Sequence, residues 1–253
     1  MIDTHAHLTS PLLERPLEPL LLRAQEAGIR TIINICTDLK SLEEGLKLSL
    51  LHPWIYNAAA TTPHDVEREG EFFFPFVEKH ADRLVAIGET GLDYHYEHSR
   101  RELQQAFLIR YFELAKRVDL PIVIHCRDAF SDLFKLADKH YAGRALLVHC
   151  FTGTQEEVEE SLARGWMISF SGIVTFKKSE FLKEVAKKVP IDRLVIETDT
   201  PYLAPNSKRG KQNEPAFIQE TAECIAQLKG VNLDVFVAQT THNSRAFFQR
   251  MNL

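Results

Sequence analysis

Residues 121–140 read PIVIHCRDAFSDLFKLADKH, and they contain the unit from which the fold is predicted. The run Pro121–Ile124 is short, aliphatic and β-branched, which is typical of a strand buried on both faces. A histidine, His125, follows it directly, and the amphipathic stretch Ala129–His140 then predicts a helix. This segment therefore predicts a strand with a polar carboxyl end, followed by a helix.

The same unit recurs along the chain. Further apolar runs predict strands near Ile2 and at Thr31–Ile35, Ile55–Ala60, Leu84–Ile87, Ala145–Val148, Trp166–Phe170 and Leu194–Ile196. Further helices are predicted at Leu17–Ala27, Leu39–Leu51, Asp65–His80, Arg100–Arg117, Gln155–Arg164, Ser179–Lys188, Glu214–Leu228 and Asp234–Gln249. Eight strand–helix units in roughly 250 residues predict an α/β fold, a (β/α)8 TIM barrel.

The alternative fold is a doubly wound open sheet, which usually has fewer strands and often carries a glycine-rich phosphate loop. No G-x-G-x-x-G motif follows the first predicted strand. We therefore favour the barrel, and we expect residues 1–253 to form one hydrolase domain.

Composition limits the class of protein and its surroundings. Hydrophobic residues make up 45% of the sequence and charged residues 26%, as in ordinary globular proteins. The apolar stretches are too short to span a bilayer, so no membrane partner is expected. The N-terminus has no basic region followed by an apolar run, so no secretory signal is expected. Four cysteines without a C-x-x-C pair favour reduced thiols and predict a cytoplasmic location.

The formal net charge of −5 restricts how a polyanion could bind. Proteins that coat nucleic acid without sequence preference normally have a basic excess, because neutralising phosphates supplies their affinity. This chain as a whole does not attract nucleic acid. A polyanionic substrate must therefore be held locally, by metal ions or by a small basic cluster.

Histidines and carboxylates stand at or just after the ends of the first, fourth, fifth, sixth and eighth predicted strands. The carboxyl ends of barrel strands share one face, and active sites of barrel enzymes assemble there. The first two histidines are two residues apart, so on an extended chain they point the same way. We expect six side chains to converge at this face. They are His5, His7, Glu89, His125, His149 and Asp199.

The residue types predict a metal centre. Imidazole and carboxylate groups bind Zn²⁺, Mn²⁺ or Fe²⁺, and a mixed set suits a hydrolytic site with open positions; Mg²⁺ also remains possible. Six ligands exceed what one tetrahedral ion needs, so two divalent ions bridged by Glu89 or Asp199 are predicted. These two carboxylates are the candidate catalytic residues, and Asp199 is the candidate general base for a metal-activated water.

Other histidines and Glu197 have alternative interpretations. A single histidine at a strand end is often a structural residue, and only the shared placement of the six argues for metal. Val195, Glu197 and Asp199 alternate onto one face, so Glu197 either reaches the barrel mouth or orients a ligand. Both roles stay open. Five other histidines are expected to be structural or on the surface: His52, His80, His98, His140 and His242.

Five motifs resemble those of the TatD-type metal-dependent deoxyribonucleases, which belong to the amidohydrolase-like barrel group. The matching stretches are DTHAHL at 3–8, IGETGLDY at 87–94, PIVIHCRDA at 121–129, HCFTG at 149–153 and IETDTPYLAP at 196–205. The resemblance implies a TIM-barrel phosphodiesterase that uses divalent cations. It further implies a 3′–5′ exonuclease whose substrate is the 3′ end of DNA, expected to be single-stranded. The six converging residues match the metal ligands of the family.

The resemblance also suggests substrate contacts. Arg127 and the run 208–215, with Lys208 and Arg209, match a phosphate-facing loop of the family. His64 and Glu197 are further candidates. Two positions depart from the family pattern: Thr62 replaces the first histidine of a His-Pro-His motif, and Lys208 stands where histidine is common. Lysine binds phosphate as a point charge and cannot act as a near-neutral acid.

Two other functions compete with the exonuclease. The same centre could hydrolyse an ester or amide, as a deacylase of D-aminoacyl-tRNA does. A barrel that only binds nucleic acid or a partner protein is disfavoured, because histidines and carboxylates crowded together are costly without a cation. The oligomeric state is left open by the sequence.

Overall fold

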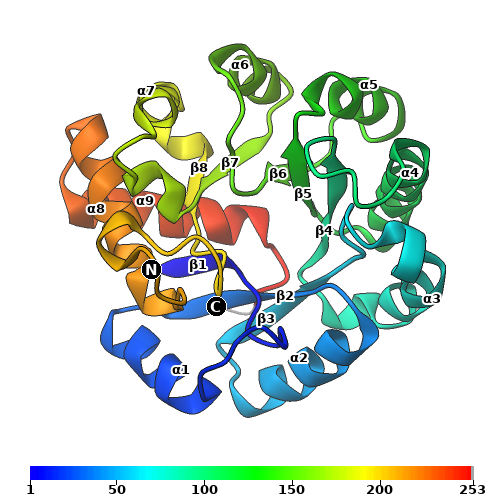
Figure 1. Ribbon diagram of the computed structural model, residues 1–253, viewed down its shortest axis with the longest axis horizontal. Helices are drawn as coiled ribbons and strands as arrows, with labels where there is room; N and C mark the ends of the chain where they lie inside the picture. Colours follow the sequence, from blue (N-terminus) through cyan, green and yellow to red (C-terminus); the bar gives the residue numbers. More distant parts are fainter. Residues whose placement is uncertain (252–253) are drawn as a thin grey trace.

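A computed structural model describes residues 1–251, and its eight strands form one all-parallel sheet in chain order. Figure 1 shows the strands around a common centre with the helices outside them. The (β/α)8 barrel prediction is therefore confirmed, although positions 252 and 253 of the predicted domain lie outside the described residues. The strands are β1 (Ile2–Ala6), β2 (Thr31–Cys36), β3 (Ile55–Ala59), β4 (Ala86–Asp93), β5 (Ile122–Arg127), β6 (Leu146–Val148), β7 (Met167–Phe170) and β8 (Leu194–Ile196).

The ring closes between β1 and the segment that follows β8. An isolated parallel bridge joins Ala6 to Thr200. The backbone N–H of Asp199 donates to the carbonyl oxygen of His5 over 2.9 Å, and that of His7 donates to the oxygen of Thr200 over 2.7 Å. Three of the residues that close the barrel, His5, His7 and Asp199, therefore also belong to the predicted metal centre.

Helices cover the outside of the barrel (Figure 1). They bury the apolar residues of the strands and of their own inner faces in one large core. None of the described helices combines the length and the apolar character needed to cross a membrane. The helices are α1 (Leu17–Glu26), α2 (Leu39–Leu51), α3 (Val66–Lys79), α4 (Arg101–Val118), α5 (Phe130–His140), α6 (Gln155–Ala163), α7 (Glu180–Lys188), α8 (Ile218–Lys229) and α9 (Leu233–Phe247).

A second, smaller core fills the barrel and is closed at the amino ends of the strands by the C-terminal segment. Phe247, Phe248 and Met251 pack there against inward-pointing strand residues such as Val123 and Val195. This seal leaves the carboxyl ends of the strands as the open face of the barrel. The predicted site residues lie at that face.

Three strands, β1, β4 and β5, extend past their predicted ends into the polar site residues. β4 was predicted to end at Ile87 but continues to Asp93, so Glu89 lies inside the strand and not after it. β5 was predicted to end at Ile124 but continues to Arg127, so His125 lies inside it. β1 likewise includes His5. Polar side chains do not interrupt these strands because the backbone still pairs with its neighbours, while the side chains face the polar barrel mouth.

A buried polar network connects α2, β2 and β3 to the segment after β1. The Asn34 amide donates to Asn57 Oδ1 over 2.9 Å, and its Oδ1 accepts from the N–H of Leu8 over 2.9 Å. The amide of Asn57 donates to the carbonyl oxygen of Gly45 over 3.0 Å. Glycine is required in α2 at this position, because a Cβ would lie 2.5 Å from Asn57 Oδ1 and 2.7 Å from Asn34 Nδ2.

Gly45→Ala is expected to destabilise the protein by about 1–3 kcal/mol through overpacking. Helix propensity alone predicts the opposite sign, a gain of about 1 kcal/mol for glycine to alanine. Urea unfolding followed by circular dichroism measures the difference. Lys47→Ala, on the exposed side of the same helix, is the control and should stay within about 0.5 kcal/mol of wild type. A stabilised Gly45→Ala variant would contradict the packing argument.

Candidate metal centre

The six predicted side chains converge at the open face, and they form two groups that share Glu89. In the first group, the Nε2 atoms of His5 and His7 lie 3.1 and 3.5 Å from Glu89 Oε2. The same two nitrogens lie 3.8 and 3.4 Å from Asp199 Oδ1. His5 Nε2 and His7 Nε2 are themselves 3.2 Å apart. Four potential ligand atoms therefore surround one point.

The second group uses the other oxygen of Glu89. Glu89 Oε1 lies 3.6 Å from His125 Nδ1 and 3.5 Å from His149 Nε2, and these two nitrogens are 3.3 Å apart. The carboxylate of Glu89 thus has one oxygen in each group. This is the arrangement expected of a bridging ligand, as predicted for Glu89 or Asp199.

The spacing and chemistry of these atoms fit divalent cations. Ligands placed ~2.1 Å from a tetrahedral ion lie about 3.4 Å from one another, which is close to the separations in both groups. Imidazole nitrogens and carboxylate oxygens are also the donor types that zinc, manganese and iron accept. The centre is largely buried, and four imidazoles with two carboxylates are costly to hold there without a cation.

The local backbone aims Asp199 into this centre. Asp199 follows β8 in a left-handed conformation with φ of 59°. Aspartate tolerates this conformation better than most residues do. Its N–H is held by the His5 carbonyl, so the two side chains come from neighbouring points of the closed ring.

Burial and mutual contacts shift the protonation of the centre. Burial, together with nearby His149, lowers the pKa of His5 to about 4. Burial also disfavours a charged His149, but Glu89 and Glu197 outweigh it and raise the His149 pKa well above its usual value. Although burial opposes the charged form of Glu89, His149 and His5 hold the pKa of Glu89 well below its usual value. In the metal-free protein His149 therefore carries a proton at neutral pH, and a bound cation would replace that proton.

His7 follows the same pattern. Burial would lower its pKa, but the contacts with Asp199 and Glu89 raise it. Two of the four histidines thus bind a proton more tightly than free imidazole does. Cation binding must displace those protons.

Glu197 lies beneath the centre and does not reach the cavity surface. Its side chain is fully buried, and its Oε1 lies 3.3 Å from His149 Nδ1. His5 Nδ1 and Glu197 Oε2 are buried and have no hydrogen-bond partner, and His5, His149 and Glu197 offer ligand atoms within 4.8 Å of one another. The Nε2 atoms of both rings face the two groups described above. This position favours the second role left open by the sequence, in which Glu197 orients ligand histidines, over a contact with substrate.

Asp93 lies beside the centre and was not selected by the sequence analysis. It is fully buried, its Oδ2 lies 2.8 Å from His125 Nε2, and its Oδ1 accepts from the N–H of Tyr96 over 2.8 Å. Burial opposes its charged form, but His125 holds the pKa of Asp93 down to about 2. The alternation Glu89, Gly91, Asp93 along one face of β4 could have identified it, had the strand been predicted beyond Ile87.

A cavity of about 490 Å³ opens at the centre. His64 and Arg127, two of the predicted substrate residues, line it, and Arg127 is the single lysine or arginine among its lining residues. The guanidinium lies 4.9 Å above the centre of the Tyr96 ring. Five of the six ligand-type residues also line the cavity, while His5 is covered by them. These five are His7, Glu89, His125, His149 and Asp199.

Lys208 and Arg209, the other predicted substrate residues, do not line the cavity. Lys208 lies 5.4 Å from the centre of the Phe217 ring, and the Arg209 guanidinium lies 4.2 Å from that of Phe176. Thr62, which replaces a family histidine, does line the cavity, and its hydroxyl donates to Asp65 Oδ2 over 3.1 Å. The departure therefore falls on the cavity wall itself.

Comparison with known proteins points to one family. Residues 2–249 match the family described as TatD related DNase. The uncharacterized metal-dependent hydrolase YabD of Bacillus subtilis is 36% identical, with 98% of this chain and 99% of that protein covered. The 3′-5′ ssDNA/RNA exonuclease TatD of Erwinia amylovora is 31% identical, with coverage of 98% and 99%. The crystal structure of YjjV, a TatD homologue from Escherichia coli, superimposes with a TM-score of 0.92 at 27% identity, covering 98% of both chains.

Cation binding is expected to release protons, because contacts with carboxylates raise the pKa values of His7 and His149 and these rings bind protons more tightly. Apparent Mn²⁺ affinity should therefore rise with pH, by about tenfold per unit for each proton displaced, until these histidines lose their protons. Calorimetric titration in buffers of different ionisation enthalpy counts the protons. An affinity that does not change between pH 6 and pH 8 would contradict these protonation states.

Glu197→Gln is expected to weaken Mn²⁺ binding by about 10–100-fold while the fold is kept, because the amide no longer orients the histidine ring as the carboxylate does. Calorimetry measures the affinity, and circular dichroism checks the fold. The control is Glu223→Gln, the same change at an exposed position of α8. Unchanged affinity in Glu197→Gln would remove the orienting role.

Proposed function

The chain belongs to the family of TatD-related DNases, which are metal-dependent hydrolases, and from this membership we propose that it is a 3′–5′ exonuclease acting on single-stranded DNA. One observation carries the proposal: two groups of ligand atoms share the Glu89 carboxylate at the edge of one cavity. A relative that is 31% identical over nearly its whole length is named as a 3′-5′ ssDNA/RNA exonuclease.

We assign the metal ligands accordingly. His5, His7 and Asp199 would hold one divalent cation, His125 and His149 the other, and Glu89 would bridge them. Bound there, such cations supply Lewis-acid stabilisation of the charge that develops on the phosphoryl oxygens during hydrolysis. The separations within both groups support this assignment.

Asp199 is the proposed general base. Its Oδ1 is the oxygen that lies nearest to the Nε2 atoms of His5 and His7. Oδ2 would take the proton from the attacking water, which makes the water a stronger nucleophile toward phosphorus. Asp199 lines the cavity, so it can meet both water and substrate.

Arg127 is the proposed phosphate contact. It is the one fixed cation of the cavity wall, and the Tyr96 hydroxyl accepts from its Nη1 over 3.3 Å. A guanidinium binds two phosphate oxygens at once, which fixes the orientation of the scissile group. His64, on the same wall, is a further proposed contact. The proposal places the whole reaction in one barrel domain, residues 1–253, and the cytoplasmic location remains a prediction.

The test is the degradation of 5′-labelled single-stranded DNA in Mn²⁺. We expect products shortened stepwise from the 3′ end, with no reaction after chelation. Asp199→Asn should lower kcat by about 10²–10⁴-fold, because the amide cannot accept the proton and is a poorer ligand. Asp192→Asn, the same change at an exposed position far from the centre, should leave the rate unchanged.

A parallel assay with D-aminoacyl-tRNA separates the competing activity. Metal-dependent release of the amino acid without any shortening of DNA would replace the exonuclease with a deacylase. Shortening from the 5′ end, or activity that persists in Asp199→Asn, would reject the proposed polarity or the proposed base.

A further inference from the structure

The cavity rim carries strong positive charge on one side. Two loops contribute it there, one between β7 and α7 and the other between β8 and α8. Within residues 1–251 none of these side chains forms an ion pair, and all but the half-buried Lys208 are exposed. We call this surface the basic rim. It consists of Lys177, Lys178, Lys208, Arg209 and Lys211.

The two loops are joined into one surface. The Arg209 guanidinium lies 4.2 Å from the centre of the Phe176 ring, beside Lys177 in the chain. The N–H of Asn206 donates to the hydroxyl of Thr175 over 2.8 Å. A Cβ on Gly172 would lie 2.4 Å from the carbonyl oxygen of Leu203, so only glycine allows the loops to approach this closely. The two loops that carry the five cations therefore lie against each other.

The basic rim adjoins the cavity. Ile173 and Leu203, from the same two loops, line the cavity together with Asp199. The cavity volume of about 490 Å³ is in the range of pockets that enclose one drug-sized ligand. A single-stranded nucleic acid longer than the cavity must therefore extend out of it. On this side of the barrel mouth it would pass directly over the basic rim.

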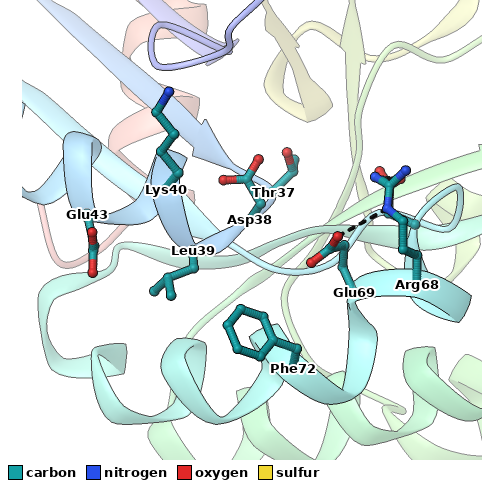
Figure 2. A pocket seen from close by; sticks show the side chains of 9 residues that line it. Thr37, Asp38, Leu39, Lys40, Glu43, Arg68, Glu69 and Phe72 are labelled. Carbon is teal, nitrogen blue, oxygen red and sulfur yellow. Dashed lines mark hydrogen bonds and ion pairs between the residues drawn. The ribbon is translucent and has the colours of Figure 1, made fainter.

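The opposite side of the barrel mouth has the other sign of charge. Figure 2 shows a groove between α2 and α3, which lie across the barrel from α7 and α8 in Figure 1. The groove shares Thr37 and Asp65 with the cavity, so it is a second route by which a nucleic acid could extend out of the cavity. Four carboxylates line it against two cations, and Arg68 is already paired with Asp65 and Glu69. The groove repels a polyanion.

We propose that the basic rim binds backbone phosphates of the single-stranded substrate that lie outside the cavity. This inference rests on the proposed exonuclease and adds the path of its substrate. In a protein of net charge −5, these unpaired cations supply the local attraction that a polyanion needs. They can meet phosphates without breaking ion pairs, whereas Arg68 on the other side cannot. Lys177 and Lys178 are the strongest test, because both are exposed and precede α7.

The test compares two charge reversals of equal size. Lys177→Glu with Lys178→Glu alters the rim, and Lys187→Glu with Lys188→Glu alters the far end of the same helix, α7. Binding of a fluorescent thymidine oligonucleotide, twelve residues long with phosphorothioate linkages, is followed by anisotropy across a salt series. Hydrolysis of a thymidine dinucleotide reports on the centre alone.

We expect the rim variant to bind the oligonucleotide about tenfold more weakly or worse at ~0.1 M salt, and to lower the slope of log affinity against log salt by about 1–2. Its dinucleotide hydrolysis and the binding by the control variant should match wild type. Equal weakening in both variants would mean that net charge alone acts, and would overturn the rim.

The remaining outcomes separate this inference from the function on which it rests. If the wild-type protein degrades DNA and the rim variant binds the oligonucleotide as tightly as wild type does, the role of the basic rim is wrong and the exonuclease assignment stands. If the protein degrades no DNA but the rim variant binds the oligonucleotide more weakly, the phosphate-binding role of the basic rim is supported and the exonuclease assignment is wrong. Transfer RNA could instead bind more tightly than the oligonucleotide, and the rim variant could lose affinity for transfer RNA alone. That result would mean that the basic rim binds folded RNA, and it would overturn the proposed path of the single-stranded substrate.

Discussion

The closure of the barrel and the assembly of the metal centre are one event in this protein. The hydrogen bond from the Asp199 N–H to the His5 carbonyl, and the one from the His7 N–H to the Thr200 carbonyl, join the first strand to the segment after the last. The side chains of three of these residues, His5, His7 and Asp199, belong to the first ligand group. Any loosening of these two hydrogen bonds displaces the ligand atoms, and their positions must be held to within a few tenths of an ångström to bind a cation well. The remaining strands bring Glu89, His125 and His149 to the same rim.

Much of this arrangement follows from the sequence because the barrel imposes it. Strands buried on both faces appear as short aliphatic runs, and parallel strands place their carboxyl ends together, so residues as distant as His5 and Asp199 could be predicted to meet. Strand ends were harder to predict. In β4 the polar residues of the barrel mouth mimic the end of a strand, and for this reason Asp93 was missed. Whether the six converging residues bind metal remains a prediction.

Tertiary contacts set the rest, and no local pattern encodes them. Lys208 and Arg209 were predicted beside the substrate, yet they lie outside the cavity, where Phe217 and Phe176 hold them. Lys177 and Lys178 are separated from that loop by about thirty residues. The two loops become neighbours through the Phe176–Arg209 contact, the Asn206–Thr175 hydrogen bond and the close approach of Gly172 to Leu203. Glu197 could be placed on the correct face by its alternation with Asp199. Its depth beneath the histidine rings depends on how the strands tilt around the barrel.

The seam between the two ends of the barrel also sets the order of events during synthesis. His5 leaves the ribosome nearly two hundred residues before Asp199, an interval of about 10–40 s at roughly 5–20 residues per second. Until then the edge of β1 has no partner on that side, and the first two histidines of the site lack the carboxylate of Asp199. The nascent chain therefore passes through a stage in which the unpaired edge of β1 and an incomplete metal site are exposed together. Such an edge can pair with other chains and aggregate, so chaperones would have to shield it.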